Sequence, residues 1–210
     1  MRPTVVELFT SQGCSSCPPA DALLGELAKR ADVIAVAFHV DYWNDLGWID
    51  PFSSPTATQR QNRYARALDL PSAFTPQVVI DGRRSVLGSD QQGIVPLLTH
   101  TAAASALELE IAADQLVITA PGGEPVGSLD VNLIAYLSRA ATPIGRGENS
   151  GRVLTEYNIV QLFKRVGSWQ GKPATIKVPL ASLPATADRI AVLLQTPNQG
   201  AIVGAAAIQR

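Results

Sequence analysis

The sequence predicts an α/β domain over residues 1–104, followed by an all-β, sandwich-like domain over residues 105–210. Two patterns support this division. The first half alternates short apolar runs with amphipathic segments, which is typical of strands connected by helices. The second half consists of short stretches in which polar and apolar residues alternate between turns, which is typical of antiparallel sheets. The chain has 210 residues, 46% of them hydrophobic, so it can bury one large core or two small ones.

A strand, a helix and a second strand are predicted at the start of the chain. Residues 4–11, TVVELFTS, form a β-branched and apolar run that ends in polar residues. Residues 20–31 place leucines at helical spacing. Residues 32–43 are nearly all apolar, as expected for a parallel strand that is covered on both faces. A right-handed crossover would bring the carboxyl ends of both strands and the start of the helix to one edge of the sheet.

The remainder of the first half continues this pattern after an insertion at about residues 42–58. The Ser-Pro pair at 54–55 is a favourable start for the next helix. Residues 77–80, an Asp-Gly turn and residues 85–87 predict a β-hairpin. A last helix is predicted over about residues 90–104. The resulting order, β-α-β, then α, then β-β-α, is the connectivity of a thioredoxin fold.

Seven strands are predicted in the second half, arranged as a sandwich of immunoglobulin-like general shape. Residues 158–166, NIVQLFKRV, fit a helix as well as a strand. The loop 143–158 is rich in glycine and polar residues and lacks the spacing of a phosphate-binding loop, so we assign no chemistry to it. Four of its residues could touch the first half of the chain or a partner, namely Arg146, Glu148, Asn149 and Arg152. The alternative is a solvated hairpin connection. The predicted strands are 106–113, 115–120, 128–140, 152–169, 174–180, 188–197 and 200–209.

The only two cysteines, Cys14 and Cys17, lie between the first strand and the first helix. A thiol at a helix N-terminus feels unpaired N–H groups and the positive end of the helix dipole, and both favour the thiolate. Cys14 would then be the exposed attacking group, and Cys17, one turn further on, the resolving group. Ser15 and Ser16 would add hydroxyl donors beside the sulfurs. The alternative is that the cysteines are merely two small buried residues.

Other classes of site find less support. Two cysteines are too few for a disulfide-stapled scaffold, and a zinc site usually needs four ligands. A three-ligand metal site of Cys14, Cys17 and His39 stays open, whereas His100 is predicted to lie on the surface, late in the last helix. The net charge of −1 gives no electrostatic reason to expect nucleic acid, and no apolar run is long enough to span a bilayer. We therefore predict no metal and no cofactor.

Two titratable residues lie near the end of the second predicted strand. His39 and Asp41 are two positions apart, so they would share one face. Either could act as a general base toward Cys17. Alternatively, the two could form a hydrogen-bonded pair that anchors the insertion. Asp45 and Asp50 are weaker candidates for the base.

Aromatic residues gather in the insertion and near the predicted cysteine edge. They predict one wall of an apolar groove, in which Tyr42 and Trp43 would contact the substrate. A satellite core beneath a long loop is the alternative. The aromatic residues in question are Phe9, Tyr42, Trp43, Trp48, Phe52 and Phe74.

Three stretches carry a resemblance to a known family. GCSSCPP after a strand, with FTPQVVIDG about sixty residues later, resembles the active-site pair and cis-proline loop of thioredoxin-like proteins. More narrowly, VVELFTSQGCSSCPPADALL, HVDYW and TPQVVIDG resemble the bacterial thioredoxin-like family known as domain of unknown function 1223, whose members are often described as predicted secreted proteins. The resemblance covers the first half of the chain. It implies that Cys14 and Cys17 are a redox pair, that Pro76 is a cis-proline, and that Thr75 offers its backbone to a peptide substrate.

These observations together predict a thiol–disulfide oxidoreductase that acts on protein thiols or disulfides. The alternative is a non-catalytic binding protein that carries a structural disulfide or a soft-metal site, for example for copper(I). The Ser-Ser dipeptide between the cysteines does not tell whether the pair oxidises or reduces its substrate. The chain as given shows no signal peptide, and the resemblance alone implies a periplasmic or secreted location.

Overall fold

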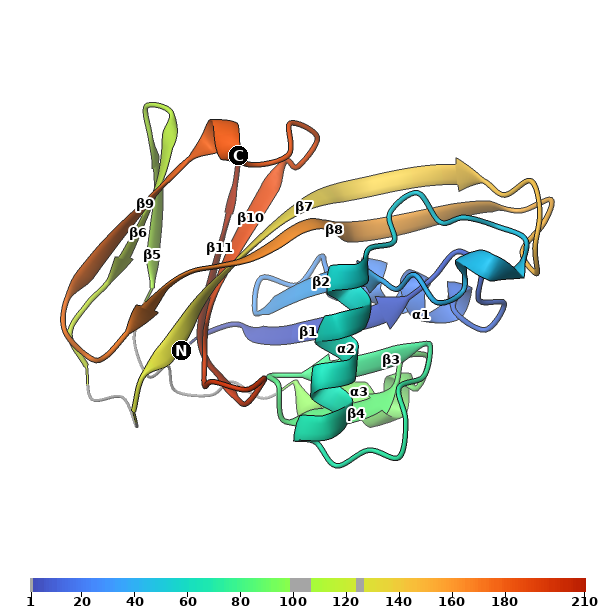
Figure 1. Cartoon of the computed structure of the whole chain (residues 1–210), viewed down its shortest axis with the longest axis horizontal. Helices are drawn as coiled ribbons and strands as arrows, with labels where there is room; N and C mark the ends of the chain where they lie inside the picture. Colours follow the sequence, from blue (N-terminus) through green and yellow to red (C-terminus); the bar gives the residue numbers. More distant parts are fainter. Residues whose placement is uncertain (1, 99–106, 124–126) are drawn as a thin grey trace.

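The computed structural model describes residues 2–98, 107–123 and 127–210, and 43% of these residues lie in strands and 18% in helices (Figure 1). The end of the helix predicted at 90–104, the boundary predicted at 104/105 and His100 all lie outside the described residues. The elements are β1 Thr4–Thr10, α1 Pro18–Leu27, β2 Val33–His39, η1 Asn44–Leu46, α2 Pro55–Ala67, β3 Gln77–Ile80, β4 Arg84–Leu87, α3 Gln91–Ile94, η2 Val95–Leu97, β5 Glu108–Ala112, β6 Gln115–Ala120, β7 Leu129–Pro143, β8 Val153–Trp169, β9 Ala174–Pro179, η3 Leu180–Ser182, β10 Arg189–Gln195 and β11 Ile202–Gln209.

The predicted fold class is wrong: the chain does not form an α/β thioredoxin-like domain followed by a separate β-sandwich. One mixed sheet runs through both halves in the order β11-β10-β7-β8-β2-β1-β3-β4, and the described residues contain only three short α-helices. The reason is the length of β7 and β8, which have 15 and 17 residues. This hairpin reaches from the second half to β2, whose edge would otherwise present unpaired N–H and C=O groups. That residues 1–104 and 105–210 are separate folding units stays a prediction.

The individual elements agree more closely with the sequence. β1 and β2 are parallel, with Thr10 opposite His39 at their carboxyl ends. α2 begins at Pro55, and the Ser54 side chain accepts a hydrogen bond from the backbone N–H of Ala57. The β3–β4 hairpin turns through Asp81 and Gly82, both with positive φ. Strands also form in all seven predicted segments of the second half, including the ambiguous 158–166.

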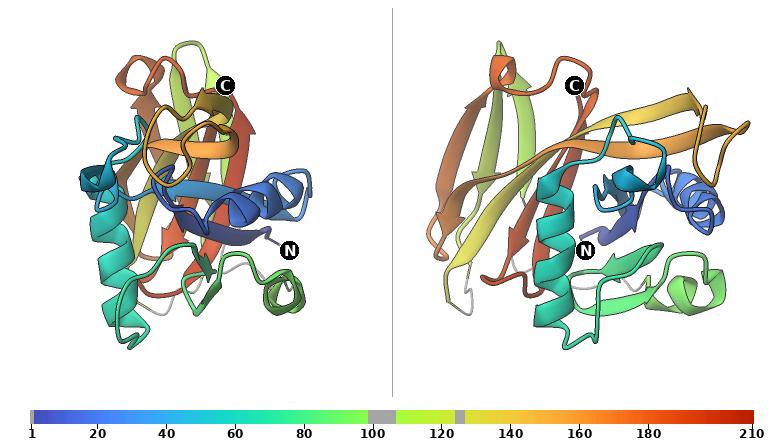
Figure 2. Two further views of the ribbon diagram at one scale, coloured as in Figure 1. Left: turned by 90° about the vertical axis from the view of Figure 1, so that its right-hand side faces the viewer. Right: turned by 45° about the vertical axis from the view of Figure 1, so that its right-hand side comes forward.

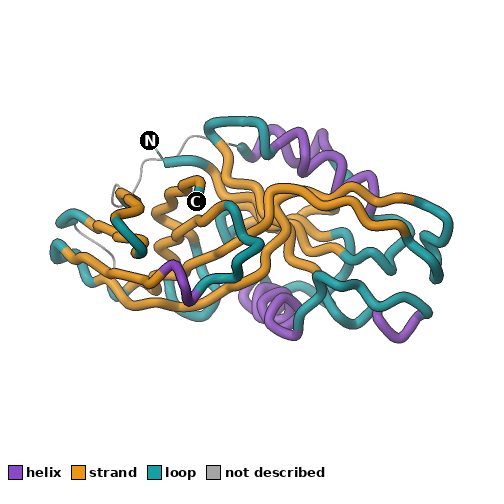
Figure 3. Tube along the Cα trace, turned by 90° about the horizontal axis from the view of Figure 1, so that it is seen from above, coloured by secondary structure: helices purple, strands orange, loops and turns teal. Residues whose placement is uncertain are grey.

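Helices cover both faces of the sheet in its β1–β2 region, with α2 on one face and α1 and α3 on the other (Figure 3). Side chains of β1 alternate between these faces, as the period of two requires. Val5 and Phe9 pack with Tyr64 of α2, whereas Leu8 packs with Leu24 of α1. Both faces of the central strands are therefore buried, which explains their continuous apolar sequence.

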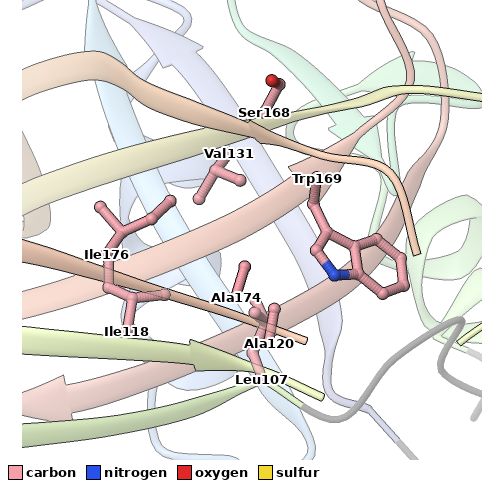
Figure 4. A pocket seen from close by; sticks show the side chains of 8 residues that line it. All are labelled: Leu107, Ile118, Ala120, Val131, Ser168, Trp169, Ala174 and Ile176. Carbon is pink, nitrogen blue, oxygen red and sulfur yellow. The ribbon is translucent and has the colours of Figure 1, made fainter. Parts of the chain in front are cut away.

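The far end of the molecule is sandwich-like. The three-stranded sheet β5-β6-β9 packs against the region of β7 and β10, and Leu116 and Ile118 of β6 belong to the same core as Val192. Figure 4 shows the apolar side chains where the sheets meet, among them Ile176 and the buried Trp169. The expected face-to-face packing of sheets exists here, but one of the two sheets is the end of the long mixed sheet.

A buried ion pair joins β1, α2 and the second half of the chain. Nε of Arg60 lies 2.7 Å from Oε1 of Glu7, and neither side chain is exposed. The hydroxyl of Tyr64 donates to Oε2 of Glu7. Arg60 also donates to Oε1 of Gln195 on β10 at 3.2 Å, and its guanidinium lies 4.2 Å from the ring centre of Phe163 on β8. Because both side chains are buried away from solvent, the charge of each is stabilised mainly by the opposite charge of the other.

We expect Glu7→Gln to lower the free energy of unfolding by about 3 kcal/mol or more, because it leaves the Arg60 guanidinium buried and uncompensated. Urea denaturation of the oxidised protein would measure this. The matched control is Glu26→Gln, which removes an exposed pair with Lys29 and should cost less than about 0.5 kcal/mol. Equal losses in the two variants would contradict the proposed importance of the buried pair.

Candidate functional site

Cys14 and Cys17 form a disulfide at the carboxyl edge of β1, with their Cα atoms 5.4 Å apart. The predicted pairing of the two sulfurs is therefore present. Both cysteines are fully buried, whereas Ser15 and Ser16 between them are exposed. The expectation that Cys14 is an exposed group is wrong in this oxidised form. The hydroxyl of Ser16 lies 3.4 Å from Sγ of Cys14.

The helix begins closer to the cysteines than the predicted range of 20–31, but it does not include them. α1 begins at Pro18, Cys17 is its N-cap residue, and Cys14 lies in the preceding turn, where its carbonyl accepts from the N–H of Cys17 at 3.2 Å. The first two helical positions are the prolines Pro18 and Pro19, which have no N–H group. The free donors expected to stabilise a thiolate are thus missing from this turn, and the helix dipole is the contribution that remains.

A loop from the second half of the chain lies against the cysteine turn. The side-chain amide of Asn149 donates to the carbonyl oxygens of Gln12 and Cys14, at 2.9 and 3.0 Å. The Glu148 carboxylate accepts from the backbone N–H of Ser15 at 3.1 Å. Figure 2 shows this turn, between β7 and β8, next to the start of α1. Glu148 and Asn149 are two of the four loop residues that could touch the first half of the chain, but their partners could not be named from the sequence, because more than 130 residues separate them.

A buried cluster of acids and one histidine lies beneath the same edge. Nδ1 of His39 is 2.7 Å from Oδ2 of Asp50, which also accepts from the N–H of Gln12 at 2.9 Å. The Gln12 side chain in turn donates to Glu156 of β8 at 2.7 Å. Asp21, in the first turn of α1, is buried within electrostatic range of this group. Gln12 therefore connects the acid cluster to the turn that carries Cys14.

The cluster shifts the pKa values of its members strongly. Burial raises the pKa of Asp21 to about 7, although the positive charge of His39 opposes the shift. Burial by itself would lower the pKa of His39. The carboxylate of Asp50, assisted by Glu156, outweighs burial and raises the pKa of His39 to about 9. Burial likewise raises the pKa of Glu156. For Asp50, burial acts in the same direction, but His39 and two backbone N–H groups outweigh it and lower its pKa.

Two acceptor or donor atoms of the cluster lack a hydrogen-bond partner within the described part of the chain. They are Nε2 of His39 and Oε1 of Glu156. Together with a carboxyl that titrates near neutral pH, they make the cluster able to take up or release a proton close to the disulfide. Asp21 and Glu156 were not predicted as site residues; Asp21 was visible only as an acidic residue near a helix start.

The predicted candidates around the cysteines divide between different partners. His39 and Asp41 do not pair with each other. The carboxylate of Asp41 accepts from the hydroxyl of Thr58 on α2, and the backbone N–H of Asp41 donates to the oxygen of that hydroxyl at 3.0 Å. These contacts fit an anchor for the insertion, and the role of Asp41 as a base stays a prediction. The peptide bond between Thr75 and Pro76 is cis, as the resemblance implied, and Pro76 is buried.

The predicted aromatic wall is only partly assembled. Phe9 stacks on Phe38 in the core, and Phe52 packs edge-on against the ring of His39. Trp43 donates from Nε1 to the hydroxyl of Thr75 at 2.9 Å, which places these two predicted substrate contacts side by side. Tyr42 is 42% exposed and donates to the side chain of Gln61 on α2. Trp48 donates to the side chain of Gln12 and so packs against the cysteine turn.

Neither a metal cluster nor a membrane span is found in the parts of the chain that the structure describes. No group of three or more His, Cys, Asp or Glu residues there is arranged to hold a metal ion. No described helix is both long and apolar enough to cross a bilayer.

Comparison with known proteins matches residues 5–195 to the family described as "Protein of unknown function (DUF1223)". The chain belongs to this family. The crystal structure of protein AGR_C_4864 from Agrobacterium tumefaciens has a similar architecture. It is 34% identical and superimposes with a TM-score of 0.88, and the match covers 100% of this chain and 95% of that one. Membership of the DUF1223 family is thus confirmed, whereas the thioredoxin-like character and the secreted location are not confirmed by these comparisons.

HBP35 of Porphyromonas gingivalis shares the fold at lower similarity. It is 14% identical, with a TM-score of 0.67, and the match covers 99% of this chain and 75% of that one. At this identity the likeness concerns the fold alone. No functionally curated protein shows significant sequence similarity to the chain.

We expect the stability of this DUF1223 protein to fall as the pH rises from 5 to 9. An acid whose pKa is raised to about 7, as for Asp21, holds a proton that the unfolded chain has released above pH 4, so its contribution is lost as the pH approaches 7. The contribution of His39 is complete below pH 6.5 and is lost as the pH passes 9. Melting temperatures at pH 5, 7 and 9 would measure the decline.

The variant Asp21→Asn separates the two contributions. Its neutral amide cannot titrate, so the decline between pH 5 and 7 should become shallower while the decline between pH 7 and 9 persists. Identical pH profiles for the variant and the natural protein would show that Asp21 does not hold a proton near neutrality.

Proposed function

We propose that this DUF1223 protein is a thiol–disulfide oxidoreductase whose Cys14–Cys17 pair exchanges with protein thiols or disulfides. The observation that carries the proposal is the disulfide itself, which closes a loop of only four residues. The entropy that a disulfide removes from the unfolded chain grows with loop length, so this bridge stabilises the fold by about 2 kcal/mol at most. It also connects a turn to a helix start that backbone hydrogen bonds already hold together. Redox exchange accounts for such a pair better than stapling does.

The proposed reaction starts at Cys14. A substrate thiolate attacks Sγ of Cys14, the bond between the two sulfurs breaks, and Cys17 leaves as a thiolate and takes a proton. A second substrate thiolate then attacks the substrate sulfur of the mixed disulfide, which forms the substrate disulfide and releases the Cys14 thiolate. Two electrons pass from the substrate dithiol to the pair, and the reverse sequence reduces a substrate disulfide.

The placement of the residues supports this division of roles. Cys17 caps α1, where the helix dipole favours a departing thiolate. Cys14 lies in the turn with the exposed Ser15 and Ser16, the side from which a substrate would come. Asp21 lies one turn after Cys17, and its pKa of about 7 suits a group that exchanges a proton with that sulfur. Asp21 is a better candidate than Asp41, whose hydrogen bonds go to Thr58.

Thr75, Trp43 and Tyr42 are proposed to contact the substrate. The exposed Tyr42 and the hydrogen-bonded pair of Trp43 and Thr75 leave an aromatic surface beside the cis peptide bond. A periplasmic or secreted location is part of the proposal and rests on the family resemblance alone.

The second candidate function is a non-catalytic binding protein with a structural disulfide. The complete burial of both cysteines favours it, since a sulfur has to be reached before it can exchange. The two functions differ in the reduction potential of the pair, because structural disulfides lie below about −300 mV.

We expect the lone Cys14 thiolate of Cys17→Ser to attack a disulfide-bonded model protein and accumulate as a mixed disulfide, because the group that would resolve it is missing. Cys14→Ser, which lacks the attacking sulfur, should accumulate at least about tenfold less. Non-reducing gels with mass spectrometry would identify the adduct. Glu26→Gln, which removes an exposed ion pair at the far end of α1, serves as the control and should exchange like the natural protein. A potential below about −300 mV, together with no adduct in either variant, would contradict the proposed function.

A further inference from the structure

The turn between β7 and β8, residues 144–152, is called here the hairpin cover. It is held together by its own hydrogen bonds: the N–H of Gly151 donates to the carbonyl of Ile144 at 2.8 Å, and the Arg152 side chain donates to Oδ1 of Asn149 at 3.1 Å. Gly147 and Gly151 have φ values of 77° and 81°, which glycine adopts without strain. The hairpin cover is therefore a preformed unit rather than a segment shaped by the surface beneath it.

The hydrogen bonds of the hairpin cover to the cysteine turn come from two neighbouring residues. Asn149, 1% exposed, donates to the carbonyls of Gln12 and Cys14, and Glu148 accepts from Ser15. The Asn149 amide donates to both carbonyls from one side chain. If this side chain moved away, the carbonyl of Gln12 would lose this donor and that of Cys14 would keep only the N–H of Cys17, so each could accept from water or from the backbone of another chain.

Cys14 has no exposed surface while this contact is in place. Disulfide exchange requires the attacking sulfur to reach Sγ, so the closed arrangement and the proposed reaction exclude each other. A unit that is rigid within itself and attached through a few hydrogen bonds opens at lower free energy than the sheet beside it, because fewer interactions have to break.

We propose that the hairpin cover is a movable cover over Cys14, and that Asn149 is the positioning residue that latches it. The inference rests on the proposed function and adds that access to the sulfur, and hence the choice of thiol substrate, is controlled by a segment from the second half of the chain. Opening removes the Asn149 donor from the carbonyl of Cys14, which keeps the N–H of Cys17, and it frees the N–H of Ser15. The second lone pair of this carbonyl and the N–H of Ser15 then offer one acceptor and one donor to the extended backbone of a protein substrate.

The test compares the rate at which dithiothreitol reduces the disulfide in the natural protein and in variants of the hairpin cover, with alkylation and mass spectrometry as the readout. Asn149→Ala and Asn149→Asp both remove the two donated hydrogen bonds, and the second keeps the size of the side chain. Each should raise the second-order rate constant on the order of tenfold, as expected for the loss of two hydrogen bonds. Ser150→Ala is the matched control, because Ser150 is exposed and its hydroxyl donates only within the hairpin cover, to Gly145.

Folded Asn149 variants with rate constants within about twofold of the natural protein would overturn the proposal. Should the Asn149 variants not fold, Glu148→Ala decides, because it changes an exposed side chain and should still give a rise of about threefold through the loss of one hydrogen bond. No rise in that variant would overturn the proposal equally.

Turnover of a reduced model protein, measured in the same variants, separates this inference from the proposed function. If the Asn149 variants are reduced faster by dithiothreitol but show no turnover, the movable cover is supported and the oxidoreductase function is refuted. If turnover is seen but the reduction rates do not change, the oxidoreductase function is supported and the movable cover is refuted.

Discussion

The pairing of β8 with β2 is the constraint on which the rest of the molecule depends. Ala37 lies opposite Ile159, and the side chain of Asn158, which has a positive φ, donates to the carbonyl of Ala35 at 2.7 Å. From this contact, β8 runs in one direction to the three-stranded sheet and in the other to the cysteine edge (Figure 1). A single strand thus brings Glu156 into the acid cluster and the adjoining turn onto Cys14. Without this pairing, the site would lack Glu156 and the turn that lies on Cys14.

Buried charge reinforces the pairing on both faces of the sheet. On the face of α2, Arg60 pairs with Glu7 and also donates to Gln195 from β10. On the face of α1, His39 and Asp50 lie with Glu156 from β8. Ionised groups without water are costly unless all partners are in place, so a displacement of one half against the other would leave charges uncompensated. These networks therefore specify one relative position of the two halves.

The chemistry of the site reflects a balance between protection and reactivity. Pro18 and Pro19 remove the N–H donors that would have stabilised a thiolate at the start of α1, and the closed turn hides both sulfurs. In the proposed reaction, the helix dipole, the buried acid cluster beneath the turn and the proposed motion of the hairpin cover would have to make Cys14 reactive. A static, exposed thiolate, as the sequence pattern suggested, is not how this edge is built.

The sequence by itself determined the local elements and the cysteine pair. The apolar run of β1, the Ser-Pro start of α2, the Asp-Gly turn and the two-residue gap between Cys14 and Cys17 all act over a few residues, where periodicity and turn chemistry are strong signals. Only the tertiary structure decided that β8 joins β2, that Asn149 lies on the cysteine turn and that Asp21, Asp50 and Glu156 share one buried cluster. Strand pairing uses backbone groups that every residue carries, so the alternation of side chains shows that a strand exists but not which strand it joins. Contacts between residues more than a hundred positions apart likewise depend on which strands pair. For this reason most strands and helices could be predicted from the sequence, whereas the fold class could not.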